Sequence, residues 1–81
     1  MEYVVYDKTD MSIVGFGGSF REASLDALNR NFSSPRDFDC ESESFDDLLD
    51  ELDRTGADLC CAVGGWCVAT QDNYRDAVRN S

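Results

Sequence analysis

The side chains of this sequence that could do chemistry are carboxylates and thiols, and the carboxylates gather in one segment, DFDCESESFDDLLDELD (residues 37–53). Between Asp37 and Asp58 there are ten acidic residues against the single basic residue Arg54, which gives this stretch a net charge of −9. The whole chain of 81 residues carries −10, so the rest contributes only −1. The negative charge is a local feature and not a coat over the whole surface.

Calcium binding is one chemistry that such a segment suggests. Asp37, Asp39 and Glu41 would take positions one, three and five of an EF-hand loop. The sixth position, which requires glycine, is Ser42, and the twelfth, which requires a bidentate glutamate, is Leu48. These departures argue against a calcium loop, and only weak, non-specific cation binding stays open.

The four cysteines suggest metal, redox or nucleophilic chemistry, and their context argues against each. They form no C-x-x-C pair, and the chain has no histidine that could complete a zinc site or act as a base for a thiolate. No apolar run approaches the ~20 residues of a membrane span, and Glu2 and Asp7 stand where a secretory leader would carry basic residues. We therefore expect a cytoplasmic protein with reduced thiols and no cofactor. The cysteines are Cys40, Cys60, Cys61 and Cys67.

Two further patterns resemble parts of catalytic sites. The stretch GFGGSF (residues 15–20) has the glycines of a phosphate loop but lacks its lysine and the required glycine spacing, so flexible glycines that lead into a helix are the simpler interpretation. The paired carboxylates are expected on an exposed surface, without the apolar pocket that would raise the pKa of one of them. The sequence therefore predicts no enzyme activity.

The elements that position these residues follow from hydrophobic periodicity. Two apolar runs around DKTD predict a hairpin at the start of the chain, and the S-x-x-E box of Ser19 and Glu22 begins a helix at about 20–32. Ser44 caps a second helix with an apolar stripe of leucines, which Gly56 ends.

The last third of the chain predicts a second hairpin and a final helix. DLCCAVGGWCVAT (residues 58–70) has two short apolar runs around a Gly-Gly turn, and Thr70 can cap the helix that follows. We expect one α+β domain over residues 1–81, with the element order ββααββα and an antiparallel four-stranded sheet. Its core is expected to contain Trp66, Leu28, Leu48, Leu49, Leu52 and Val68.

Two interpretations of the acidic segment remain. An ordinary solvated helix face accounts for the carboxylates opposite the leucines, although such a face usually mixes in lysines that stabilise the helix. Alternatively, if the stretch before the helix is extended, its alternate carboxylates stand roughly 6.6 Å apart, and with the helix they resemble a phosphate track that a basic groove could bind. The candidate partner-binding residues are Asp37, Asp39, Glu41, Glu43, Asp46, Asp47, Asp50, Glu51 and Asp53.

The chain also resembles the small acidic anti-defence proteins of phages, which include anti-CRISPR proteins and DNA-mimic antirestriction proteins. This resemblance rests on the size, on the opening YVVYDKTDMSIVGFGGSFREASLDAL and on the acidic block from Asp37 to Asp53. It implies a stoichiometric inhibitor in the host cytoplasm that binds a basic, nucleic-acid-binding effector and blocks recruitment of DNA or RNA. The alternative is an interaction module or small regulatory subunit that binds through an apolar patch and is acidic only for solubility.

Overall fold

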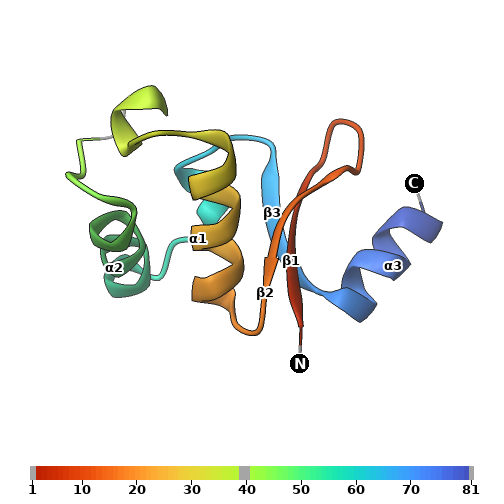
Figure 1. Ribbon diagram of the computed structural model, residues 1–81. Coiled ribbons are helices and arrows are strands. Elements are labelled where there is room, and N and C mark those ends of the chain that lie inside the picture. Colours follow the sequence, from red (N-terminus) through yellow and green to blue (C-terminus); the bar gives the residue numbers. More distant parts are fainter. Residues whose placement is uncertain (1, 39–40, 81) are drawn as a thin grey trace.

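The computed structural model describes residues 2–38 and 41–80 and has an α+β fold (Figure 1). The elements in chain order are strand β1 (Tyr3–Asp7), strand β2 (Ile13–Gly17), helix α1 (Phe20–Asn31), the 3-10 helix η1 (Pro35–Phe38), helix α2 (Phe45–Thr55), the 3-10 helix η2 (Leu59–Cys61), strand β3 (Trp66–Thr70) and helix α3 (Gln71–Arg79).

Within the described residues the sheet has three antiparallel strands in the order β2-β1-β3. Strand β1 is central, since Tyr3 pairs with Gly17 of β2 on one side and with Thr70 of β3 on the other. The predicted hairpin of β1 and β2 is confirmed. The predicted four-stranded sheet is wrong, because the run before Gly64 is not a strand.

That run forms η2, and its hydrogen bonds explain why. The Val63 N–H donates to the Leu59 carbonyl over 3.0 Å, which closes a helical turn. Leu59 and Val63 are four residues apart, so one turn buries both, leaving 0% and 8% of them exposed. A strand would also place these two residues on one face, and a short apolar run does not distinguish the two structures. Gly65, at a φ of 92°, then turns the chain into β3.

Helix α1 packs very closely on β2, because two of the strand residues are glycines. A Cβ atom at Gly15 would lie 2.5 Å from the Cβ of Ala27, and one at Gly17 would lie 2.6 Å from the backbone nitrogen of Ala23. Both alanines are fully buried. These glycines are therefore required by helix-sheet packing, which the interpretation as a flexible entry to a helix missed.

The ends of the helices follow the sequence signals. The side chains of Ser19, Ser44 and Thr70 each accept a hydrogen bond from the backbone N–H three residues later, at 3.2, 3.2 and 3.3 Å. Gly56 ends α2 in the left-handed region, at a φ of 72°. The predicted caps Ser19, Ser44, Thr70 and Gly56 are confirmed, whereas the Glu22 half of the predicted S-x-x-E box is not, because Glu22 accepts from the Gly18 N–H.

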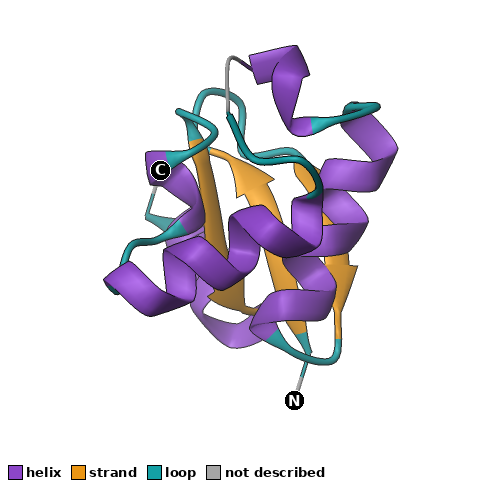
Figure 2. Cartoon of the chain, turned by 90° about the vertical axis from the view of Figure 1, so that its left-hand side faces the viewer, coloured by secondary structure: helices purple, strands orange, loops and turns teal. Residues whose placement is uncertain are grey.

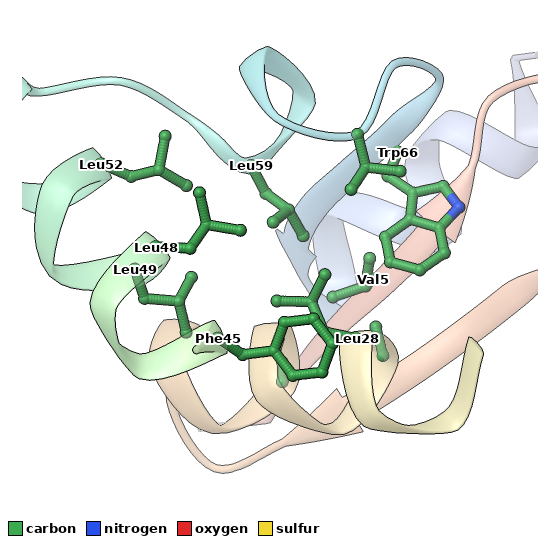
Figure 3. Close-up of a cluster of buried hydrophobic side chains, with 11 residues drawn as sticks. Val5, Leu28, Phe45, Leu48, Leu49, Leu52, Leu59 and Trp66 are labelled. Carbon is green, nitrogen blue, oxygen red and sulfur yellow. The ribbon is translucent and has the colours of Figure 1, made fainter. Parts of the chain in front are cut away.

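The core lies between the sheet, α1 and α2. In Figure 3 the leucines of α2 point toward Leu59, and Leu28 of α1 lies nearer to Val5 and Trp66. Leu28 is fully buried, and only 6% of Trp66 is exposed. The predicted core is confirmed for five of its residues, while the sixth, Val68, is partly buried against the cluster. The five are Trp66, Leu28, Leu48, Leu49 and Leu52.

Helix α3 covers part of the opposite face of the sheet (Figure 1). The view from the α2 side has α1 and α2 in front of the three strands (Figure 2). The ring of Tyr74 in α3 lies 5.1 Å from that of Tyr6 in β1, and its hydroxyl donates a hydrogen bond of 2.6 Å to the Met11 carbonyl. No residue of α3 is itself buried, and Tyr74 and Ala77 are half-buried.

Candidate functional site

The acidic residues of α2 form an exposed face opposite the buried leucines. Ser44 caps the helix, and Phe45 and Leu49 face the core, so the intervening carboxylates point outward. The side chains of Asp46 and Asp50 are 67% and 68% exposed. The structure therefore brings together five of the predicted residues, which are Asp46, Asp47, Asp50, Glu51 and Asp53.

The stretch before α2 differs from the extended track that the phosphate-like interpretation assumed. Asp37 lies in η1, where its carboxylate accepts hydrogen bonds from the N–H groups of Ser33 and Ser34 at 2.7 and 3.3 Å. An aspartate two to four residues after a free N–H commonly closes a local turn in this way. Asp37 therefore holds the chain in a turn, and Asp39 lies outside the described residues together with Cys40.

Glu41 and Glu43 join the helical carboxylates around a shallow hollow of about 430 Å³. Its lining holds five carboxylates and one guanidinium, a formal excess of four negative charges. The guanidinium belongs to Arg54, whose Nη2 lies 3.9 Å from Glu51 Oε1 and so neutralises this group weakly. We call this region the acidic hollow. It is lined by Glu41, Ser42, Glu43, Asp47, Asp50, Glu51 and Arg54.

Arg21 of α1 is a charged partner of this surface that the sequence analysis missed. Its guanidinium donates to Asp46 at 3.0 Å and to Asp50 at 2.8 Å, so it connects α1 with α2. The hydrogen bonds to Asp46 and then Asp50 raise the pKa of Arg21 above its usual value. One signal was present in the sequence: a cation in the first turn of a helix opposes the helix dipole, and the contacts with α2 offset that cost.

The glycine-rich turn before α1 is unsuited to a phosphate. The carboxylate of Glu22 accepts a hydrogen bond of 3.0 Å from the Gly18 N–H, so it does not reach back to Ser19 as a capping box requires. An anion at the start of this helix would be repelled by the Glu22 carboxylate, which already accepts the hydrogen bond of the Gly18 N–H. This geometry argues against a phosphate site at GFGGSF, while the packing of α1 on Gly15 and Gly17 explains two of its glycines.

The three cysteines that the structure describes lie in η2 and β3. Cys60 and Cys61 belong to the first apolar run of the predicted second hairpin, and they lie instead in η2, with Cys61 exposed. Burial, followed by the neighbouring Cys61 and Cys67, raises the pKa of the Cys60 thiol. A raised pKa keeps the thiol protonated, which opposes its use as a nucleophile. In the described part of the chain no group of three acidic or cysteine residues could hold a metal ion.

A second exposed surface is apolar and lies on the side of the sheet that α3 covers in part. A bulge between Val5 and Tyr6 shifts the pairing, so that Ile13 and Phe16 both share the face of Val4 and Tyr6. Ile13 is 50% exposed and Phe16 53%. The Arg30 guanidinium covers one side of the Phe16 ring at 5.4 Å from its centre.

Comparison with known proteins adds no relative. No family model matches the sequence, and the searches of curated proteins and of solved structures returned no match. Within residues 2–38 and 41–80, none of the helices has the length and apolar character needed to cross a membrane.

Proposed function

We propose that this protein is a stoichiometric inhibitor of the anti-CRISPR or DNA-mimic kind, acting in the cytoplasm of a host cell. Its negatively charged surface binds a basic groove of a nucleic-acid-binding effector and blocks recruitment of DNA or RNA. The proposed activity is protein-protein interaction without catalytic turnover and without a cofactor.

The observation that carries this proposal is the acidic hollow. Five carboxylates on two segments face one opening. Among the described residues, Arg54 in the lining pairs weakly with Glu51, and Arg21 of α1 pairs with Asp50, so three of the five have no ion pair with an arginine. Helix carboxylates one turn apart repel each other by a few tenths of a kcal/mol per pair, so the arrangement is unfavourable for the isolated helix. A lysine- or arginine-lined groove would relieve this repulsion on binding and gain rate and specificity from the complementary charge.

The test is a charge reversal that spares the fold. Glu41, Glu43 and Glu51 line the hollow but do not pair with Arg21, and none of them lies in the first turn of α2. We expect the triple change of these residues to lysine to abolish inhibition of target-DNA binding by a purified CRISPR effector complex in a mobility-shift assay. The affinity of the unsubstituted protein for the effector is expected to fall steeply as the salt concentration rises, because exposed charges are screened.

The matched control reverses three carboxylates elsewhere, Glu2, Asp72 and Asp76, and so changes the net charge equally. Circular dichroism checks that both variants fold. Equal loss of inhibition in the two variants would mean that net charge alone matters. Full inhibition by the hollow variant would refute the proposed surface.

The exposed apolar face supports the alternative, a regulatory subunit or interaction module that docks through Ile13 and Phe16. Binding through that face would depend little on salt and would be lost in Phe16→Asp, whereas the hollow variant would bind normally. The two candidate functions are therefore separated by the same assay.

A further inference from the structure

The two edges of the sheet differ in how their backbone groups are satisfied. At the β2 edge, side chains of α1 bind the outward backbone: Asp26 accepts from the Phe16 N–H at 3.0 Å, and Asn31 donates to the Val14 carbonyl at 3.4 Å. Such side-chain caps prevent another strand from pairing with an edge.

Among the described residues, no side chain caps the β3 edge in this way. The Lys8 N–H donates to the Gly65 carbonyl and the Gln71 N–H to the Glu2 carbonyl, which fixes odd-numbered residues of this stretch as those that bond to β1. The even-numbered residues therefore point their backbone groups outward. No hydrogen bond found within residues 2–38 and 41–80 uses the Trp66 carbonyl, either backbone group of Val68 or the Thr70 N–H.

A small cavity of about 100 Å³ lies along this open edge. Phe20 of α1 and Leu59 of η2 form its apolar wall, and Cys67 and Val68 of β3 line it from the strand. Phe20 is 38% exposed there. Alternate side chains of an added strand would point to this side, and the cavity accepts one aliphatic side chain.

We propose that the outer edge of β3 binds an extended, basic peptide segment of another protein as a fourth strand, with one aliphatic side chain in the cavity. The charge of the edge selects this occupant. Of the residues that the structure describes, Asp58 is the only charged one in the lining of the cavity, and it is exposed. A lysine or arginine flanking the aliphatic residue would pair with it, whereas a second copy of this chain would bring −10 against −10.

The edge site shares no lining residue with the acidic hollow, so it goes beyond the proposed function and can fail or hold independently of it. The probe is a seven-residue peptide with valines at alternate central positions, threonines between them and a lysine at each end. We expect it to slow amide hydrogen exchange at Val68 and Thr70 at least tenfold in the full chain labelled with nitrogen-15. Amides of β2 should not change.

Two control peptides test separately the contribution of backbone hydrogen bonds and the contribution of the peptide's positive charge. N-methylation of those peptide amides that face β3 should remove the protection, and glutamates in place of the lysines should weaken binding at least fivefold. On the protein side, Asp58→Lys should weaken the lysine peptide similarly, and Val68→Pro should abolish binding by removing an outward N–H. If Val68→Pro does not fold, the N-methylated peptide tests the same hydrogen bonds from the other side.

Three results would overturn the proposal. One is protection that survives N-methylation, and another is a response confined to amides of the acidic hollow. The third is a dimer by light scattering in which Val68 and Thr70 are already protected without peptide, because the edge would then belong to a second copy.

Discussion

Gly15 has no side chain because α1 occupies the space where one would be. A methyl group there would lie 2.5 Å from both the Cβ and the backbone nitrogen of Ala27, and backbone cannot move aside cheaply. We expect Gly15→Ala to lower the free energy of unfolding by about 1–3 kcal/mol, as overpacking does. Urea denaturation measures this change.

Gly64 is the matched control for that substitution. Nothing lies within 4 Å of a Cβ built at Gly64, and its φ is not positive. Gly64→Ala should leave stability unchanged or raise it slightly by restricting the unfolded chain. Equal loss in both variants would contradict the assigned contact between β2 and α1.

Asp26 should make stability depend on pH. The hydrogen bond from Arg30 and then that from the Phe16 N–H lower the pKa of its carboxyl. A lowered folded-state pKa stabilises the fold above the unfolded-state value of about 3.9, and this contribution is lost as the pH falls through the folded-state value. Asp26→Asn should be less stable than the parent by about 1 kcal/mol near neutral pH.

The difference between Asp26→Asn and the parent should shrink as the pH falls through the lowered folded-state pKa of Asp26, because the protonated carboxyl is then uncharged like the amide of asparagine. Urea denaturation at several pH values follows it. A difference that is the same at every pH would mean that Asp26 acts through packing and not through its charge.

At the scale of elements, Arg21 connects the two helices that cover one face of the sheet. We expect Arg21→Ala to lower the stability of the fold only slightly, because both ion pairs are exposed and screened by solvent. It should also free Asp46 and Asp50 and thereby strengthen binding to a basic effector. Thermal unfolding at low and high salt measures the first effect, and inhibition of DNA binding the second.

Arg75→Ala is the control, since it removes the same charge from α3, far from the acidic hollow in sequence and on the other side of the sheet (Figure 1). Arg75→Ala should leave inhibition at low salt unchanged, whereas Arg21→Ala should strengthen it. The same gain from both variants would assign the effect to net charge.

The helices were predictable from the sequence where capping and periodicity agreed, as with Ser44, the leucine stripe and Gly56 in α2. The stretch at 58–63 was not, because Leu59 and Val63 share a face in a strand and in a helical turn alike. The prediction of the acidic surface was correct for the carboxylates of α2 and for Glu41 and Glu43, which line the acidic hollow, but not for Asp37. The carboxylate of Asp37 is held locally by hydrogen bonds from the N–H groups of Ser33 and Ser34. The contacts of Arg21 depend on how α1 and α2 pack, which no local pattern contains.

At the scale of the whole molecule, stability rests on one cluster of buried hydrophobic side chains, to which the sheet, α1, α2 and η2 all contribute. Trp66→Ala and Leu49→Ala should each cost about 2–5 kcal/mol, enough to unfold a domain of this size. Ile13→Ala, at an apolar residue that is half exposed, should cost far less. The three variants are compared by their melting temperatures. Unchanged values for both core variants would contradict the assigned packing.

The strand order also fixes when this protein can fold during synthesis. β1 and β2 are neighbours in sequence and can pair early. Tyr3 of β1 can pair with β3 only after Thr70 has been synthesised, which is 67 residues further on (70 − 3). Until β3 leaves the ribosome, the central strand has one open side and the cluster lacks Trp66. Contacts of such long range slow folding, so the native sheet forms only after nearly all of the described chain has been made.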